Sequence, residues 1–406
     1  MIETIDRILR QLSHDRPDLP FGLVTWDGGE RRYGEGGPIF VLELRTQQAA
    51  TDVVTRGTLG FGEAYMRGDL EVQGDLQALL AFAWHPAVKD LDLSARDKAK
   101  LLGSYLRGRN NARRSRENVA HHYDLGNDFY RLWLDRSMTY SCAYWADDCA
   151  TLEEAQEAKY EHLCRKLHLE EGDRLVDIGC GWGGMLAYAA RTYGATGVGY
   201  TLSTEQADWA NDRLRAEGLY PDVHVELQDY REARGRFDKF VSIGMFEHVG
   251  KEYYRTFFGK VAELLVPGGI GVLHTIGSDV AGPVNEWTTT YIFPGGYLPT
   301  MAQIAEPLGL CGLVMTDMEN LRLHYARTLD EWADRFEQHV DEVRTMFDER
   351  FVRMWRFYLA GSSVGFKEGG NRLFQVTFTK GLRDLPFTRD HLCRLEAEKR
   401  DWVEAQ

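Results

Sequence analysis

The stretch "RLVDIGCGWGG", Arg174 to Gly184, is a short apolar run that ends in an aspartate and a cluster of glycines. The helical pattern "MLAYAARTYG" follows directly, so the stretch is typical of a strand, a tight turn and a helix. Glycines in such a turn let the backbone approach a ligand closely. The pattern therefore predicts a ligand site at the carboxyl end of a parallel strand.

The segments around this turn continue the alternation of strands and helices. The expected strands are "RLVDIG", "TGVGYT", "VHVELQD", "KFVSIGM" and "IGVLHTIG", the last after a "PGG" turn. A further strand (313–318), a long helical stretch (329–359) and the strand "RLFQVTFTK" follow, and the insertion 278–310 interrupts the rhythm. This order predicts an α/β fold with a doubly wound, mostly parallel, Rossmann-like sheet.

The N-terminal part has a different pattern and predicts a smaller mixed α/β module. "FGLVTWDGGERRYG" is typical of a hairpin, "IFVLELR" of a strand, and "FGEAYMRGDLEVQGDLQALLAFAWH" of a helix, a short strand and a helix. We therefore expect a module in residues 1–88, a basic linker in 89–117 and a catalytic domain in 118–406.

The composition is that of a globular protein with a substantial core. The 406 residues are 44% hydrophobic and 27% charged, and the net charge of -14 argues against general nucleic-acid binding. A basic run from Lys98 to Arg116 is either a solvated linker or a surface for an anionic partner. The six cysteines form no CxxC pair, so no metal is expected, and the absence of a signal peptide or apolar span predicts a soluble, cytoplasmic protein.

The glycine turn has three interpretations: a plain structural turn, a dinucleotide site, or a site for S-adenosylmethionine. A dinucleotide site needs a carboxylate about 20 residues after the glycines, and that region, "GVGYTLS", has none. Asp177 before the glycines can hold an ammonium group, and Asp229 at the end of a later strand can accept from an adenine amino group. Together with Gly179, Gly181 and Gly183, they favour S-adenosylmethionine.

Other polar side chains also stand near predicted strand ends. Glu247 and His248 follow "FVSIG", His274 ends "IGVLH", and Cys142 lies in "SMTYSCAYW". Because parallel strands end at one edge, Glu247 and His274 are expected to face the same ligand. Aromatic residues flank these positions and suit a long hydrocarbon or a developing cation. They are Tyr140, Tyr144, Trp145, Trp287, Tyr291, Phe293, Tyr297, Trp355, Phe357 and Tyr358.

These motifs together resemble the cyclopropane-fatty-acid synthase family, which includes the mycolic acid cyclopropane synthases. The similar segments are "ENVAHHYDLGNDFYRLWLDRSMTYSCAYW", "LVDIGCGWGG", "YTLSTEQ", "SIGMFEHVG", "VLHTIG" and "YIFPGGYLP". The resemblance implies transfer of a methylene group from S-adenosylmethionine to the cis double bond of an unsaturated phospholipid acyl chain. A carbocation forms and loses a proton to bound bicarbonate, which closes a cyclopropane ring.

The same resemblance implies the roles of individual residues. The bicarbonate cage would consist of Glu247, His274, Tyr358 and the backbone N–H groups of Cys142 and Ile276, while His248 would pack structurally. The implied cofactor residues, with Asp177 from the turn itself, form a second set. They are Tyr140, Ser141, Asp177, Gly179, Gly181, Thr201, Leu202, Gln206 and Asp229.

One position departs from the family pattern and several outcomes stay open. Many members carry cysteine where this chain has Ser362, so the pocket wall can differ. Related enzymes make methylene- or methyl-branched chains or methylate amines, and a lipid-binding scaffold with a vestigial cofactor fold is a further reading. The family also implies a homodimer, formed through an N-terminal module for lipid binding and dimerisation. It implies peripheral association with the inner membrane surface, aided by the basic run.

Overall fold

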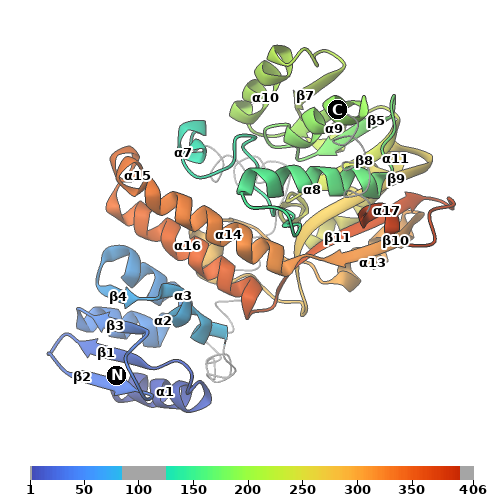
Figure 1. Cartoon of the computed structure of the whole chain (residues 1–406). Helices are drawn as coiled ribbons and strands as arrows, with labels where there is room; N and C mark the ends of the chain where they lie inside the picture. Colours follow the sequence, from blue (N-terminus) through green and yellow to red (C-terminus); the bar gives the residue numbers. More distant parts are fainter. Residues whose placement is uncertain (1, 85–124, 394–406) are drawn as a thin grey trace. The chain divides into compact units, whose positions relative to one another are not determined.

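The computed structural model describes residues 2–84 and 125–393, which form two compact units (Figure 1). Unit 1 takes the described residues up to 84 together with Val280–Leu298 and Tyr325–Asn371, and unit 2 takes the rest. The units therefore do not follow chain order, whereas the sequence divided the chain at residues 88 and 117. The predicted basic linker, 89–117, lies outside the described residues.

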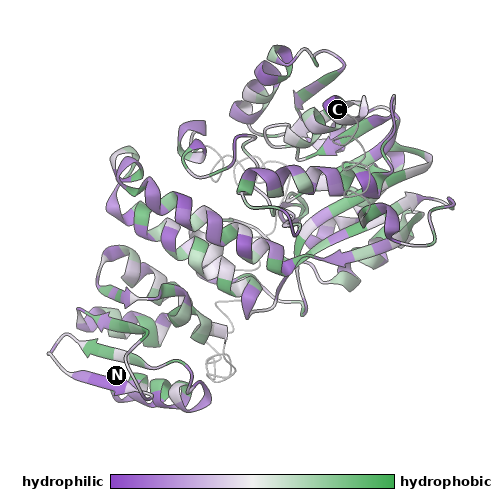
Figure 2. Cartoon of the chain, viewed as in Figure 1, coloured by the Kyte–Doolittle hydropathy of each residue, from purple (hydrophilic) through white to green (hydrophobic). Residues whose placement is uncertain are grey.

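Unit 2 is built on a seven-stranded sheet in the order β10-β11-β9-β8-β5-β6-β7, in which only the β10–β11 ladder among the printed pairings is antiparallel. This confirms the predicted doubly wound, mostly parallel sheet. The strands are β5 (Arg174–Ile178), β6 (Thr196–Thr201), β7 (Val223–Leu227), β8 (Phe237–Ile243), β9 (Leu265–Ser278), β10 (Leu313–Asn320) and β11 (Asn371–Lys380). Figure 2 shows the central strands as largely hydrophobic, as expected for strands covered on both faces.

Helices cover both faces of this sheet. The crossovers β5–α9–β6 and β6–α10–β7 move toward one edge, and β8–α11–β9 moves toward the other. Because such crossovers are right-handed, helices on steps of opposite direction lie on opposite faces. The helices of unit 2 are α7 (Asn127–Arg131), α8 (Leu152–Leu167), α9 (Gly184–Tyr193), α10 (Thr204–Ala216), α11 (Tyr254–Leu264), α13 (Met301–Leu310) and α17 (Asp390–Cys393), with short 3₁₀ turns η2 (Tyr230–Glu232), η3 (Phe246–His248) and η4 (Lys251–Tyr253).

The predicted "PGG" turn is part of strand β9 in the structure. Phe237 of β8 pairs with Leu265, but Lys239 pairs with Ile270, so the residues between form a bulge within one ladder. Gly268 has φ +75° there, a conformation that glycine adopts at little cost. The bulge ends before the segment that carries His274.

Unit 1 contains the predicted N-terminal elements and two later segments. The hairpin of β1 (Phe21–Thr25) and β2 (Glu30–Tyr33) is confirmed, and the sheet order is β2-β1-β3-β4. Its other elements are α1 (Ile2–Asp15), β3 (Phe40–Leu44), α2 (Gln47–Arg67), β4 (Leu70–Gly74), α3 (Leu76–Ala81), η1 (Phe82–Trp84), α12 (Glu286–Tyr291), most of α14 (Arg322–Gln338), α15 (Val340–Met346) and α16 (Glu349–Lys367). The inserted α12 joins this unit because the Trp287 ring lies directly over Gly62 of α2, where a Cβ would come within 2.4 Å of it.

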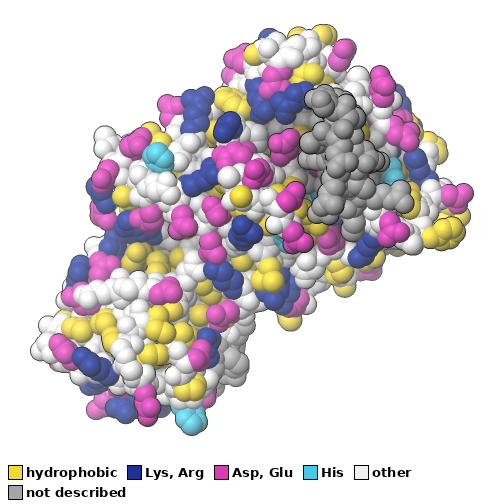
Figure 3. Space-filling model, in the orientation of Figure 1, with side chains coloured by type: hydrophobic (Ala, Val, Ile, Leu, Met, Phe, Trp, Pro, Cys, Tyr) yellow, Lys and Arg dark blue, Asp and Glu magenta, His cyan; other side chains and the backbone are white. Residues whose placement is uncertain are grey.

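The described surface is mixed in charge. On the face shown in Figure 3, acidic and basic side chains are intermingled over the described residues. None of the helices within 2–84 and 125–393 combines the length and apolar character that crossing a bilayer requires.

Candidate active site

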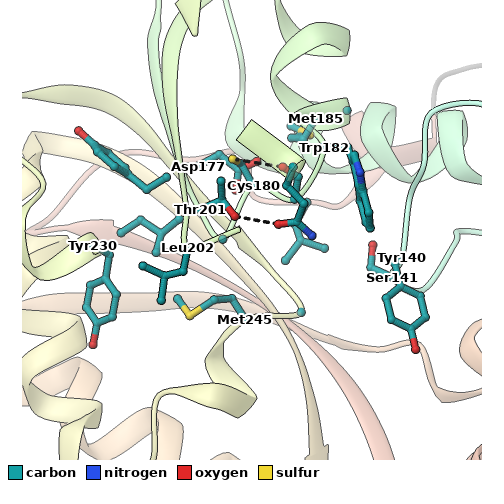
Figure 4. Close-up of a pocket in the computed structure, with 18 of the residues that line it drawn as sticks. Tyr140, Ser141, Asp177, Cys180, Trp182, Met185, Thr201, Leu202, Tyr230 and Met245 are labelled. Carbon is teal, nitrogen blue, oxygen red and sulfur yellow. Dashed lines mark hydrogen bonds between the residues drawn. The ribbon is translucent and has the colours of Figure 1, made fainter. Parts of the chain in front are cut away.

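A pocket in unit 2 lies at the carboxyl ends of β5, β6 and β8, where a doubly wound sheet binds ligands. Every residue that the sequence predicted for the cofactor lines it. These are Tyr140, Ser141, Asp177, Gly179, Gly181, Thr201, Leu202, Gln206 and Asp229. Figure 4 shows Tyr140 and Trp182 on one side and Leu202 and Tyr230 on the other, with Asp177 and Thr201 between them. The site is therefore assembled from segments spread over about a quarter of the chain.

The glycine turn forms the floor of this pocket. Gly179 has φ +80° and Gly181 has φ +54°, so both use the left-handed region that favours glycine. A Cβ on Gly179 would also lie only 2.5 Å from the Met245 side chain. A larger residue at position 179 would have to displace Met245, which itself lines the pocket.

Asp177 and Lys159 place opposite charges in the same pocket wall, and both side chains are almost fully buried. Burial raises the pKa of Asp177 to about 7, against the influence of Lys159. Burial likewise lowers the pKa of Lys159 to about 8. The Lys159 ammonium donates to Ser141 Oγ at 3.0 Å, whereas Asp177 Oδ1 has no hydrogen-bond partner among the described residues. Asp177 therefore keeps an acceptor for a ligand donor such as an ammonium group.

Three other predicted cofactor side chains are already hydrogen-bonded within the protein. The Thr201 hydroxyl donates to Gln206 Oε1 at 2.7 Å, which leaves the amide nitrogen as the donor end of that side chain. Arg231 donates two hydrogen bonds to Asp229, from Nε to Oδ1 at 2.8 Å and from Nη2 to Oδ2 at 2.6 Å. Asp229 is thus oriented by a bidentate pair, and a ligand amino group would have to share its oxygens with Arg231.

Glu247 lies in η3, just after β8, and is 6% exposed. Its Oε1 accepts from the Ile276 backbone N–H at 2.5 Å, so the amide that the resemblance assigned to an anion is used by Glu247 here. Burial raises the pKa of Glu247 to about 7, although the hydrogen bond from the Ile276 N–H opposes the shift. Glu247 Oε2 has no partner among the described residues.

His274 lies on β9, beside Ile243 of β8 and two residues before Ile276. It is 1% exposed, and burial together with the nearby charge of Lys159 lowers its pKa well below the usual value. Nδ1 lies 3.1 Å from Gln375 Nε2, while Nε2 has no partner in the described part of the chain. The strand expected to end at His274 continues to Ser278, but His274 pairs with Ile243, the last residue of β8, so it still lies beside the carboxyl end of β8, from which η3 and Glu247 follow. Each of the two residues keeps one buried polar atom without a partner in the described part of the chain.

The remaining predicted catalytic residues lie outside the lining of the pocket. Cys142 is fully buried directly after Ser141, and its thiol donates to the Ala143 carbonyl at 3.1 Å. Tyr358 belongs to unit 1, on α16, where its ring packs against Phe293 and Trp355. The predicted aromatic residues are likewise divided between the two units.

Sequence reasoning missed several pocket residues. Lys159 could have been found, because helical spacing places it on the same face as Leu152, Ala155 and Leu163, where a lysine is unexpected. His248 was expected to pack structurally but lines the pocket, and burial lowers its pKa to about 4. Trp182, Met245, Tyr230 and Arg231 also line the pocket, and no spacing rule marks them.

Comparison with known proteins agrees with this geometry. Residues 110–376 match the family described as mycolic acid cyclopropane synthetase, and residues 8–91 match a domain of unknown function (DUF7884). The cyclopropane-fatty-acyl-phospholipid synthase of Escherichia coli (strain K12) is 41% identical over 337 residues, which cover 82% of this chain and 86% of that protein.

Two further proteins extend the comparison. The tuberculostearic acid methyltransferase UfaA1 of Mycobacterium tuberculosis is 33% identical, covering 92% of this chain and 90% of that protein. The crystal structure of mycolic acid cyclopropane synthase CmaA1, complexed with SAH and CTAB, matches with a TM-score of 0.62 and 34% identity, covering 65% of this chain and 98% of that one. The chain belongs to the mycolic acid cyclopropane synthetase family and is an S-adenosylmethionine-dependent methyltransferase.

Proposed function

We propose that this protein adds a methylene group from S-adenosylmethionine across the cis double bond of a phospholipid acyl chain and closes a cyclopropane ring, with bicarbonate as the base. The observation that carries the proposal is the pair of buried, unpartnered atoms Glu247 Oε2 and His274 Nε2. A buried polar atom without a partner is costly, so a site that keeps two of them calls for a small polar group between the protein and the substrate.

The pocket at the carboxyl ends of β5, β6 and β8 fits S-adenosylmethionine, which when bound supplies an electrophilic methyl group. Asp177 Oδ1 offers an acceptor for the ligand's ammonium, and Gly179 and Gly181 leave room for close approach to the backbone. Thr201 and Gln206 present hydroxyl and amide groups, and Asp229 is held in a fixed orientation by Arg231. We assign the adenosine to Thr201, Gln206 and Asp229.

Glu247 and His274 fit a bicarbonate ion, which when bound supplies a base near the cation. An alkene is a poor nucleophile, so methyl transfer leaves a positive carbon on the acyl chain, and loss of a proton from the new methyl group closes the ring. Glu247 can accept the hydroxyl of a small anion, and a neutral His274 can donate to one of its oxygens. Cys142 and Tyr358 are further members of the cage by resemblance alone, whereas the Ile276 N–H already donates to Glu247.

The choice of a phospholipid substrate is supported by the Escherichia coli relative, whose name states that activity. Acting on such a substrate requires contact with a membrane surface, and we assign this contact to the basic run Lys98–Arg116 at about 1 kcal/mol per well-placed charge. The homodimer and the location at the inner membrane surface belong to the same proposal.

A second outcome at the same double bond is a methylene- or methyl-branched chain, which the similarity to the tuberculostearic acid methyltransferase UfaA1 of Mycobacterium tuberculosis favours. Both outcomes start from the same cation and both need a base: proton loss from the new methyl group with ring closure gives the cyclopropane, and proton loss without ring closure gives an unsaturated branched chain. A saturated methyl branch would need a hydride donor in addition. We place the ring first because the Escherichia coli relative is named for that activity.

The test uses the purified full-length protein with S-adenosylmethionine and vesicles of a cis-monounsaturated phosphatidylglycerol. We expect mass spectrometry to show a gain of one CH2 unit per modified chain and NMR to show cyclopropane protons. Removing bicarbonate with CO2-free buffer should slow the reaction, and adding it back should restore the rate. A branched product would support the second outcome, and an unmodified lipid with bound cofactor would contradict both.

A further inference from the structure

A chain of buried hydrogen bonds leads away from His274, on the side opposite its unpartnered Nε2. Gln375 of β11 lies beside His274 Nδ1 at 3.1 Å, and Lys166 of α8 donates to Gln375 Oε1 at 2.8 Å. Lys166 also donates to Glu319 of β10 at 2.6 Å, and His162 of α8 contacts the same carboxylate oxygen at 2.7 Å. All five side chains belong to unit 2.

The chemistry of these groups sets the direction of every bond in the chain. A lysine ammonium has donors and no acceptor, so the atom of Gln375 that faces Lys166 must be its oxygen. The other end of that amide is then the NH2 group, which can only donate to His274 Nδ1. An imidazole nitrogen that accepts a hydrogen bond carries no proton, so the proton of neutral His274 must be on Nε2.

At the far end of the chain, burial lowers the pKa of Lys166, and the carboxylate of Glu319, 2.6 Å away, opposes this shift and favours the ammonium form. Burial raises the pKa of Glu319, but the hydrogen bond from His162 and the charge of Lys166 outweigh it and bring the pKa to about 2. Glu319 is therefore ionised and holds the ammonium in place. Gln375 itself has no exposed surface, so solvent does not compete for its amide.

We propose that Gln375, oriented by Lys166 and Glu319, is a positioning residue that holds His274 as the Nε2–H tautomer. This arrangement makes the unpartnered Nε2 a hydrogen-bond donor. Only the role of this tautomer rests on the proposed function, because a donor at Nε2 suits an anion such as bicarbonate. The tautomer itself follows from the bonds alone. Partners of this kind, which orient a functional histidine, typically change activity by about 10- to 100-fold when they are removed.

The test reads the tautomer directly, without substrate. Long-range ¹H–¹⁵N NMR of the ¹⁵N-histidine-labelled protein gives separate Nδ1 and Nε2 signals, and the His274→Gln variant identifies those of His274 among the twelve histidines. We expect wild-type His274 to show an unprotonated Nδ1 and a protonated Nε2. In Gln375→Met the two signals should move toward those of a mixture of tautomers, and Lys166→Met should move them in the same direction.

The matched control is Thr377→Val, two residues along β11, where the buried hydroxyl has no partner among the described residues. This variant should leave the His274 signals unchanged. A protonated Nδ1 in the wild-type protein, or signals that do not respond to Gln375→Met, would overturn the inference.

A parallel assay separates this inference from the proposed function. Gln375→Met should lower turnover of lipid about 10- to 100-fold while S-adenosylhomocysteine affinity stays within about twofold. If the tautomer is as inferred but the wild-type protein modifies no lipid, the proposed function fails and the positioning role stands. If lipid is modified and His274 carries its proton on Nδ1, the positioning role fails alone.

Discussion

The cofactor pocket and the Glu247–His274 region lie on the same sheet but differ in how their polar groups are satisfied. Around β6 and β7 the protein has paired its own groups: Thr201 with Gln206, and Asp229 with Arg231. Beyond and beside the carboxyl end of β8, Glu247 Oε2 and His274 Nε2 are buried and unpaired among the described residues. The difference indicates that the first region orients a large ligand and that the second lacks a small polar partner. The predictions below test this contrast.

The largest expected effect is on turnover. Glu247→Gln keeps the shape of the side chain but removes a charged acceptor from the reacting region, so we expect product formation to fall at least about 100-fold. S-adenosylhomocysteine affinity, measured by calorimetry, should stay within about twofold, because Glu247 does not line the pocket. Glu226→Gln, at a partly exposed position of β7 outside the pocket lining, is the matched control and should leave both values unchanged. Normal turnover in Glu247→Gln would remove Glu247 from the reaction.

The second prediction concerns the dependence of stability on pH. The pKa of Glu247 is raised to about 7 in the folded protein from an ordinary 4.5, so the folded state binds the proton more tightly than the unfolded state. The stability that the folded protein gains from the proton on Glu247 is fully present below pH 4.5 and is lost as the pH rises through about 7. Over that range we expect the free energy of unfolding of the wild-type protein to fall relative to Glu247→Gln, by about 3 kcal/mol. Denaturant titrations at several pH values measure it, and a constant difference would contradict a buried, unpaired carboxyl group.

The third prediction concerns the part of the pocket around β6 and β7, where Thr201, Gln206 and Asp229 are already paired within the protein. Asp229→Asn breaks the bidentate pair with Arg231, so S-adenosylhomocysteine should bind about tenfold more weakly, the loss of about one charge-assisted hydrogen bond. Turnover at saturating cofactor should change little. Asp238→Asn removes a carboxylate held by Arg174 outside the pocket and serves as the control. If turnover falls more than affinity in Asp229→Asn, the two regions are not functionally separate.

The smallest expected effect is that of Thr201→Val. The hydroxyl donates to Gln206 Oε1 and accepts from the Ser203 N–H, so its loss should free the Gln206 amide to rotate. Cofactor affinity should fall about fivefold, equivalent to about 1 kcal/mol for one neutral hydrogen bond. Affinity equal to that of the wild-type protein would mean that Gln206 is oriented by its packing alone.

The sequence predicted the parts of the site that depend on local chemistry. Asp177, Gly179 and Gly181 were identified because a strand, a glycine turn and a helix follow one another within a few residues, and this order places them at a sheet edge. The helical spacing of α8 could have marked Lys159 as buried, but Arg231 could not be predicted in the pocket, because its pairing with Asp229 depends on the fold. It also missed that the "PGG" segment is a bulge, since the pairing of Lys239 with Ile270 depends on the neighbouring strand.

By itself, the sequence determined the α/β class, the glycine turn and the strand ends that carry Glu247 and His274, because strand and helix periodicity and glycine's conformational freedom act over short distances. Only the tertiary structure decided which state His274 adopts. Gln375 is 101 residues away along the chain and reaches His274 because β11 lies between β9 and β10 in the sheet. Lys166 and Glu319 come from still other elements. The direction of a hydrogen bond depends on all the groups that the fold brings together, and no local sequence pattern shows which groups those are.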